Sequence, residues 1–260
     1  MDLKLNNKVA LVTGGSRGLG KAICHGLAAE GAKVAVNYYR SADGKVDLAA
    51  EAAVVVAEIE KAHGVKAAAV PADVSNEADV AALFDQAQEA LGPVEVLVNN
   101  AAYCPVTPTA ETPLKEWTLA FQVNMQGTFL CARELIRRLQ AAGRKGRIVN
   151  ISSQAAFRGS ESGKTAYDAS KGAIVAFTVS LAREMAKKGI AVNCVAPGLM
   201  YTEMIKPFVD ADPEKFNARL PIGRLGLPEE VASVVAFLAS ERASFMTGAT
   251  VDVSGGMLMR

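Results

Sequence analysis

The sequence predicts one α/β domain with a parallel sheet of about seven strands and helices on both faces, a doubly wound arrangement. Short apolar runs alternate with longer amphipathic runs from one end of the chain to the other. This alternation is typical of repeated β-α-β units with right-handed crossovers. Half of the residues are hydrophobic but only 6% are aromatic, which suits strands buried on both faces. No linker or change of composition divides residues 1–260, so we expect a single domain.

Each element of this fold has its own signal. We expect strands at the short runs rich in valine, alanine and isoleucine, residues 8–13, 33–38, 65–73, 94–100, 146–153, 190–197 and 249–253. Helical patterns lie between them at residues 18–30, 45–63, 76–91, 114–142, 165–188 and 228–240. Glycine closes two helices, in AAEGAK and KAHGVK, and SNEADV opens another with cap-forming residues. The irregular segment 199–227 interrupts the alternation and is either a lid or a plain surface excursion.

Charge and composition exclude several classes of protein. The net charge of +1 gives no reason to expect nucleic acid or an anionic membrane as a partner. No apolar stretch approaches the roughly 20 residues of a membrane span, and no signal peptide is evident. We expect a cytoplasmic protein with reduced, mostly buried thiols at Cys24, Cys104, Cys131 and Cys194. His25 and His63 have no further ligands nearby in sequence, so no metal site is expected.

The first predicted strand leads directly into a helix through the turn TGGSRGLG, residues 13–20. Gly14, Gly18 and Gly20 permit a tight turn and a close backbone approach, so the helix N-terminus can face a pyrophosphate. The spacing G-x-x-x-G-x-G departs from the standard dinucleotide fingerprint, and a strand-to-helix turn requires glycine in any case. Its place in the first βα turn of the sheet nevertheless favours phosphate binding by a Rossmann-type domain.

Tyr167 and Lys171 lie four residues apart in the run TAYDASKGA and therefore share one face of a predicted helix. Such a pair occurs by accident on many helices. An ammonium one turn away, however, also favours the phenolate and lowers the pKa of a tyrosine. A tyrosine tuned in this way can serve as general acid and base near neutral pH.

Several short motifs, taken in order along the chain, resemble those of the short-chain dehydrogenase/reductase family. They are TGGSRGLG, ADV (72–74), NNAA (99–102), VNMQGTF, NISS, YDASK, VAPG (195–198) and the tail VDVSGGML. The match covers nearly the whole chain, and GRIVNISS, LPIGRLGLPEEVA and GGMLM make it most similar to the 3-oxoacyl-(acyl carrier protein) reductases. The resemblance implies an NAD(P)-dependent oxidoreductase that interconverts a ketone and a secondary alcohol by hydride transfer.

The resemblance also implies the catalytic residues. Tyr167 is expected to be the general acid/base, and Lys171 to tune it and to hold the nicotinamide ribose. Ser153 is expected to bind the substrate oxygen, and Asn124 to hold a water that relays protons to Lys171. Ser152 is the alternative to Ser153, but alignment of the motif selects the second serine.

The expected cofactor is NADP(H), with NAD(H) as the alternative. The segment VAVNYYRS lacks the acidic residue with which NAD-preferring relatives hold the adenosine ribose, and Arg17 and Arg40 can hold a 2′-phosphate. Arg40 can equally be a solvated loop residue. Ala102 replaces the glycine of the family motif N-N-A-G, and its Cβ alters the shape of the cofactor-site wall at a point where the family has a close backbone approach. The residues expected to bind the cofactor are Gly14, Ser16, Arg17, Gly18, Leu19, Gly20, Tyr38, Arg40, Asp73, Val74, Asn100, Ala101, Tyr167, Lys171, Pro197, Gly198 and Thr202.

The substrate is a small carbonyl or alcohol compound whose identity the motifs leave open. We expect its wall to comprise Ser153, Gln154, Tyr103, Phe157 and Tyr201, together with Met204. A homotetramer is expected, with one interface on the helices at 114–142 and 165–188 and the other on the helix at 228–240 and the C-terminal tail. The alternatives are an NAD-dependent sugar or polyol dehydrogenase and, more remotely, a non-catalytic nucleotide-sensing protein.

Overall fold

The computed structural model describes residues 2–41, 43–203 and 205–259. Its core is a seven-stranded parallel sheet in the order β3-β2-β1-β4-β5-β6-β7, as the sequence predicted. The strands are β1 (Val9–Val12), β2 (Lys33–Tyr38), β3 (Ala67–Pro71), β4 (Val96–Asn99), β5 (Gly146–Ile151), β6 (Ile190–Pro197) and β7 (Thr250–Val253). Valine, alanine, isoleucine and leucine fill the central strands, which are buried along their length and need an apolar cover on both faces.

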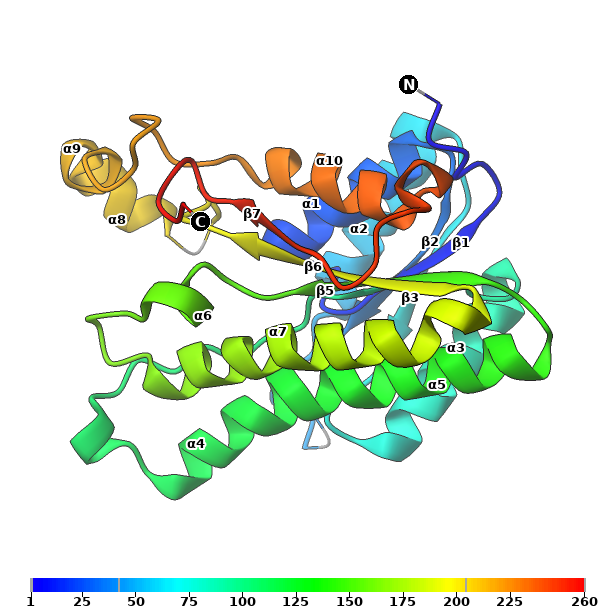
Figure 1. Cartoon of the computed structure of the whole chain (residues 1–260), viewed down its shortest axis with the longest axis horizontal. Coiled ribbons are helices and arrows are strands. Elements are labelled where there is room, and N and C mark those ends of the chain that lie inside the picture. The colour runs from blue at the N-terminus through cyan, green and yellow to red at the C-terminus, as the bar shows by residue number, and fades with distance from the viewer. Residues whose placement is uncertain (1, 42, 204, 260) are drawn as a thin grey trace.

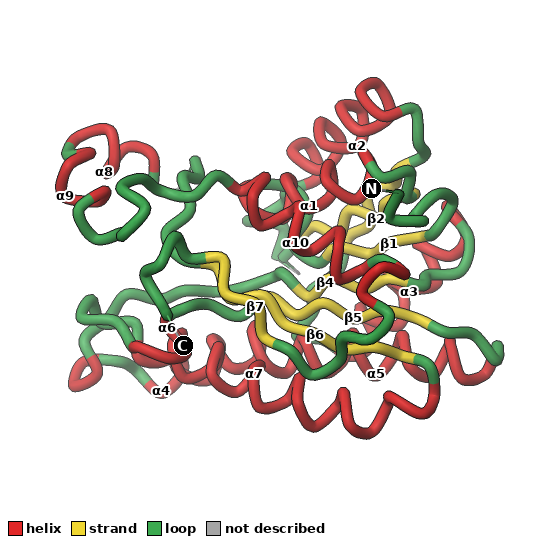
Figure 2. The backbone as a smooth tube through the Cα atoms, turned by 45° about the horizontal axis from the view of Figure 1, so that its top comes forward, coloured by secondary structure: helices red, strands yellow, loops and turns green. Residues whose placement is uncertain are grey.

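Helices provide that cover in two layers (Figures 1 and 2). One layer holds α1 (Gly18–Ala29), α2 (Ala49–His63) and α10 (Pro228–Ala239), and the other holds α3 (Glu77–Leu91), α5 (Gly127–Ala141) and α7 (Thr165–Met185). Two apolar clusters, one on each face of the sheet, join these layers to the strands. None of the helices in the described residues is long and apolar enough to cross a membrane.

Three predicted elements differ from the structure. The helix expected from residue 45 begins at Ala49, because the preceding residues form a short hairpin described below. The helix expected over 114–142 is broken into α4 (Leu114–Phe121), a turn of π-helix (Gln122–Gln126) and α5. The segment 199–227 contains the short helices α8 (Lys206–Ala211) and α9 (Pro213–Asn217), and an unexpected helix α6 (Ala155–Arg158) follows β5.

The order of the strands decides where a ligand can bind. The chain starts in the middle of the sheet at β1, runs outward to β3, and then returns to the other side of β1 at β4. The loops after β1 and β4 therefore diverge, and a crevice opens at their carboxyl ends. A small separate apolar cluster around Val209, Leu220 and Leu225 holds the 199–227 segment together beyond the ends of β6 and β7.

Candidate active site

A cavity of about 870 Å³ opens at this crevice. Many residues predicted to bind the cofactor line it: Gly14, Ser16, Arg17, Gly18, Leu19, Gly20, Asp73, Val74, Asn100, Ala101 and Thr202. They come from the turn after β1, the ends of β3 and β4, and the segment after β6. Such a size and position suit an elongated dinucleotide better than a small metabolite alone.

The glycine turn is shaped to receive an anion. Gly14 and Gly18 have φ angles of 62° and 53°, which are left-handed conformations favourable to glycine. A side chain at Gly20 would collide with the carbonyl of Gly14, whereas the space beside Gly18 is open. Arg17 caps α1 without a side-chain hydrogen bond, and the first turn carries no acidic residue. The first N–H groups of α1 are thus left for a phosphate, as the helix dipole favours.

Asn37 fixes the position of this turn, a role that the sequence did not reveal. Its side chain is buried at the end of β2, where Oδ1 accepts a hydrogen bond from the Gly14 N–H at 3.1 Å. Its Nδ2 donates to the carbonyls of Val70 and Ala72 at 3.3 and 3.4 Å, at the end of β3. Its own carbonyl accepts from the Gly15 N–H at 2.8 Å. One amide group therefore joins the phosphate turn to two strands.

The adenosine end of the cavity differs from the expectation at two residues. Tyr38 is 6% exposed and packs in the core, so Tyr39 lines the cavity in its place. The reason is the alternation of a strand, which directs neighbouring side chains to opposite faces. Arg40 does not line the cavity and instead pairs with Asp47 at 3.0 Å. The lining also includes Val46, Leu48, Leu119 and Glu203, which no motif marked, and Val123 of the motif VNMQGTF, to which no role was assigned.

Tyr167 and Lys171 lie near the N-terminus of α7, beside the end of β5. Lys171 is 2% exposed, and its Nζ donates to the carbonyl of Ile151 at 2.7 Å. The same Nζ lies 5.6 Å from the centre of the Tyr167 ring. No carboxylate pairs with Lys171 within the described parts of the chain. Burial without an acidic partner lowers the pKa of Lys171 to about 8.

Burial raises the pKa of the Tyr167 hydroxyl, and the nearby Cys104 raises it further, whereas a hydrogen bond with Ser153 opposes the shift. This direction is opposite to the lowering expected from a lysine one turn away. Lys171 faces the ring and the Ile151 carbonyl, and burial disfavours its own charged form. In the protein without cofactor, Tyr167 is therefore a protonated phenol, which is the form that donates a proton.

The two serines of NISS have different contacts. Ser152 is buried, and its Oγ donates to the carbonyl of Lys171 at 2.8 Å, which fixes β5 to α7. Ser153 is partly exposed, contacts the Tyr167 hydroxyl, and accepts a hydrogen bond from the Ala155 N–H at 3.1 Å. Only Ser153 combines access with contact to the phenol, so the geometry agrees with its selection over Ser152.

Asn124 lies in the π-helical turn, an irregularity that often marks functional sites. It is fully buried, and its Nδ2 donates to the Tyr103 carbonyl at 2.9 Å and to Ser170 Oγ at 2.8 Å. Its Oδ1 accepts from the Tyr103 N–H at 2.7 Å. These contacts hold the loop after β4 against α7, directly beside Lys171. They give Asn124 a positioning role, and the proton relay through water stays a prediction.

The remaining predicted residues lie around the outer part of the site. Pro197 ends β6 and Gly198 follows it, and the Pro197 carbonyl accepts from the Gln154 N–H at 2.9 Å. Of the predicted substrate wall, Tyr103 lines the cavity, but Ser153, Gln154, Phe157 and Tyr201 do not. Of the residues predicted to bind the cofactor, Tyr167, Lys171, Pro197 and Gly198 also lie outside this lining. The Tyr201 hydroxyl donates to Asp210 of α8 at 2.6 Å, a contact within the 199–227 segment. Met204 lies outside the described residues, and Ala102 is at the cavity wall.

Loss of the Asn37 side chain is expected to weaken cofactor binding selectively. Asn37→Ala should weaken binding of the nicotinamide dinucleotide about tenfold, because the Gly14 amide and the β3 carbonyls lose their partner. Asn193→Ala is the matched control, since this buried amide also bridges backbone groups, Met246 O and Ala249 N, but does not line the cavity. Calorimetric titration and thermal unfolding of both variants separate the two effects. Equal losses of affinity in both would show that Asn37 acts only through general stability.

Comparison with known proteins gives a consistent family. The family described as Enoyl-(Acyl carrier protein) reductase matches residues 14–258. A 3-oxoacyl-[acyl-carrier-protein] reductase from Aquifex aeolicus is 38% identical over 99% of this chain and 100% of its own. The corresponding reductase of Pseudomonas aeruginosa is 40% identical over 99% of this chain and 100% of its own.

Solved structures show the same architecture. A candidate gluconate dehydrogenase from Agrobacterium tumefaciens superposes with a TM-score of 0.90 at 32% identity, covering 100% of this chain and 99% of the other. A candidate short-chain alcohol dehydrogenase from Sinorhizobium meliloti gives 0.88 at 33% identity, with 99% and 98% covered. The chain belongs to the short-chain dehydrogenase/reductase family and is an NAD(P)-dependent oxidoreductase acting on CH–OH and C=O groups.

Proposed function

We propose that the protein is an NADP(H)-dependent carbonyl reductase of the 3-oxoacyl type, with Tyr167 as general acid in the direction of reduction. The convergence of Tyr167, Ser153 and Lys171 carries this proposal. A protonated phenol in contact with a partly exposed hydroxyl offers two hydrogen-bond donors to one carbonyl oxygen. The bound nicotinamide supplies the hydride, and these side chains orient the carbonyl and give the oxygen its proton.

The substrate class follows from the relatives. Reductases of 3-oxoacyl chains are 38–40% identical to this protein over nearly its whole length. Part of the cavity is lined by apolar side chains, such as those of Leu119 and Val123. The second candidate is a sugar or polyol dehydrogenase using NAD, which the similarity to a candidate gluconate dehydrogenase favours. A non-catalytic nucleotide sensor is the remote alternative, but this chain keeps both Tyr167 and Lys171. Initial rates with 3-oxoacyl thioesters, simple ketones and aldonates, each with both nicotinamides, separate these functions.

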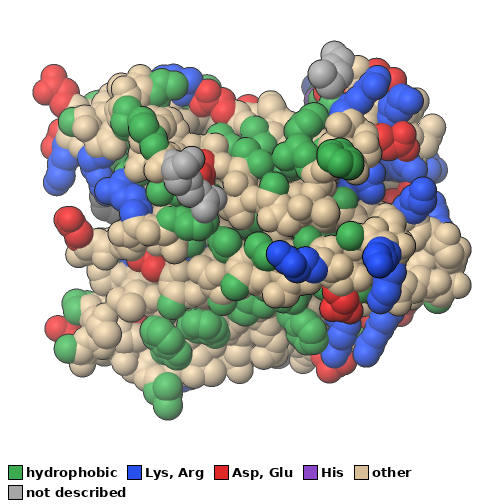
Figure 3. Space-filling view, viewed as in Figure 1, with side chains coloured by type: hydrophobic (Ala, Val, Ile, Leu, Met, Phe, Trp, Pro, Cys, Tyr) green, Lys and Arg blue, Asp and Glu red, His purple; other side chains and the backbone are tan. Residues whose placement is uncertain are grey.

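We also propose a cytoplasmic homotetramer. Apolar side chains lie exposed on the helices α4, α5 and α7, among them Trp117, Phe129 and Val179 (Figure 3). Phe245, before β7, is fully exposed. The apolar surface of α4, α5 and α7 suits one isologous interface, the exposed Phe245 is a candidate contact of a second, and two such interfaces generate D2 symmetry.

The conservative change Tyr167→Phe should remove turnover and preserve cofactor binding, because it deletes only the proton donor. General acid/base residues contribute about 10²- to 10⁴-fold to rate, so kcat for ketone reduction should fall in that range. Ser153→Ala should also lower kcat, whereas Ser152→Ala should mainly lower the thermal unfolding midpoint through its lost bond to the Lys171 carbonyl. A Tyr167→Phe enzyme that keeps more than half of the wild-type kcat would contradict the assignment.

Reduction should lose activity in alkaline solution. The pKa of Lys171 is lowered to about 8, so its ammonium is present below this pH and is lost above it. Because the cation assists the phenol in releasing its proton, kcat/KM for reduction should be level below about pH 8 and decline above it. A profile that stays level up to the ordinary lysine pKa of about 10.4 would refute this role.

Arg17 is expected to recognise the 2′-phosphate of NADP(H), since it lines the cavity and forms no ion pair within the described residues. A charge-assisted hydrogen bond contributes roughly 1.5–3 kcal/mol. Arg17→Ala should therefore reduce the preference for NADPH over NADH by about 10- to 150-fold, mainly through KM for NADPH. Lys33→Ala, at the start of β2, is a control for loss of a positive charge. A wild-type enzyme with higher kcat/KM for NADH would overturn the choice of cofactor.

A further inference from the structure

The connection between β2 and α2 is a short hairpin that forms a wall of the cavity. The Ser41 N–H donates to the Val46 carbonyl at 2.8 Å, and the Leu48 N–H donates to the Tyr39 carbonyl at 3.2 Å. Tyr39, Val46 and Leu48 all line the cavity. The hairpin therefore follows the strand end where relatives recognise the adenosine ribose, and its two arms lie beside that end of the cavity.

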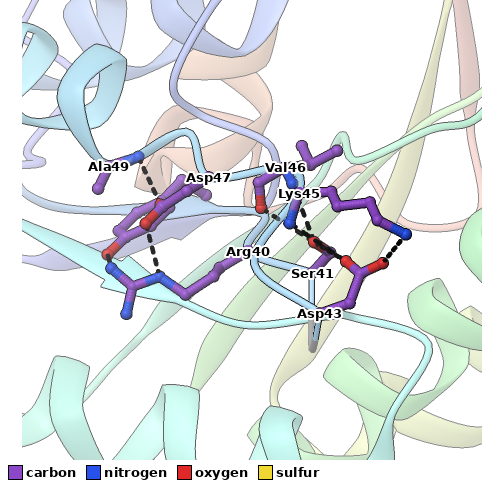
Figure 4. A network of polar contacts seen from close by, with 8 residues as sticks. Arg40, Ser41, Asp43, Lys45, Val46, Asp47 and Ala49 are labelled. Carbon is purple, nitrogen blue, oxygen red and sulfur yellow. Dashed lines mark hydrogen bonds and ion pairs between the residues drawn. The ribbon is translucent and has the colours of Figure 1, made fainter.

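Arg40 and Asp47 pair across the two arms of this hairpin (Figure 4). Arg40 Nε donates to Asp47 Oδ2 at 3.0 Å, and Arg40 Nη2 donates weakly to the Tyr38 hydroxyl at 3.4 Å. Asp47 Oδ1 accepts from the Ala49 N–H at 3.0 Å, at the start of α2. The two carboxylate oxygens of Asp47 thus have different partners: Oδ2 accepts from Arg40, and Oδ1 accepts from the backbone at the start of α2.

The pair changes what Arg40 can offer to a phosphate. Its side chain is 50% exposed and that of Asp47 is 40% exposed, so the ion pair itself stabilises the fold little. The pair matters more for a phosphate bound nearby. The Asp47 carboxylate offsets the positive charge of the Arg40 guanidinium and repels the phosphate dianion. Arg17, in contrast, faces the cavity without an acidic partner among the described residues.

We propose that Asp47 determines how strongly the enzyme discriminates between its two possible cofactors. Asp47 holds Arg40 in a neutral pair at the rim, so Arg17 supplies most of the recognition of the 2′-phosphate, and NAD(H) is penalised only moderately. Asp47 is thus a specificity-determining residue that acts through Arg40. This inference rests on the proposed use of NADP(H).

The variant Asp47→Asn isolates this effect. Asparagine keeps the Oδ1 acceptor for Ala49 but presents an amide that cannot accept from Arg40 Nε. Calorimetric titration should show NADP⁺ binding about 3- to 10-fold more tightly than in the wild type, with NAD⁺ unchanged. Adenosine 2′,5′-bisphosphate should gain by the same factor relative to AMP, and the gain should shrink at high salt.

Asp43→Asn is the matched control, because Asp43 lies in the same hairpin but pairs with Lys45 at 3.0 Å instead of with Arg40. It should leave both affinities within about twofold of the wild type. The double variant Asp47→Asn with Arg40→Ala should lose the gain, and Arg40→Gln alone should change the NADP⁺ to NAD⁺ ratio less than about twofold.

Four results would overturn the inference: an unchanged ratio in Asp47→Asn, an equal gain in Asp43→Asn, a gain that survives removal of Arg40, or a large loss of NADP⁺ affinity in Arg40→Gln. The Arg40→Gln measurement tests the same claim without altering the hydrogen bond between Asp47 and the Ala49 N–H. A large loss of NADP⁺ affinity in that variant would show that Arg40 already binds the phosphate. A wild-type preference for NAD⁺ would instead contradict the proposed cofactor, so the two failures are distinguishable.

Discussion

The hydrogen bond between the buried ammonium of Lys171 and the carbonyl of Ile151 is the contact on which the active site depends. It joins α7 to the end of β5 at 2.7 Å, and it compensates only partly for burying a positive charge without a carboxylate. Ser152 secures the same junction through the Lys171 carbonyl. Because both Tyr167 and Lys171 lie on α7, this junction fixes their position relative to the end of β5, which Ser153 follows.

Burial at this junction also sets the protonation states. It raises the pKa of Tyr167 and lowers that of Lys171 to about 8. A neutral phenol therefore lies beside an ammonium that loses its proton more readily than an exposed lysine does. A bound nicotinamide nucleotide and substrate would exclude water further and alter both groups together. A protonated phenol in this position is the form that gives a proton to a carbonyl oxygen.

At the end of the site formed by the glycine turn, neutral amide side chains and backbone groups make the buried polar contacts, and no buried charge of the described residues takes part. Asn37 anchors the phosphate turn to β2 and β3, and the first turn of α1 supplies N–H groups toward the cavity. The exposed charged groups at this end are Arg17 and the Arg40–Asp47 pair, and Asp73 and Glu203 also line the cavity. Cofactor discrimination can therefore be changed there with little effect on the fold, whereas changes at Asn37 disturb the turn itself.

The sequence was sufficient for the sheet and for the motifs, because strand runs and glycine turns have strong local signals. It was insufficient where one residue of register matters: Tyr38 enters the core and Tyr39 the cavity. The helix predicted from residue 45 begins only at Ala49, because the residues before it form the hairpin with the Arg40–Asp47 pair. The π-helical turn around Asn124 interrupts a helix that the sequence pattern predicts to be continuous. The direction of the Tyr167 pKa shift depends on the depth at which its hydroxyl is enclosed, which spacing alone does not give.

The ultraviolet titration of tyrosinate, wild type minus Tyr167→Phe, tests the central claim most directly, since the difference isolates one phenol. The account predicts no phenolate signal from Tyr167 in the cofactor-free protein up to the ordinary tyrosine pKa of about 10. A Tyr167 phenolate already present near neutral pH would contradict this account. It would show instead that Lys171 lowers the pKa of Tyr167, as the spacing of the two residues suggested.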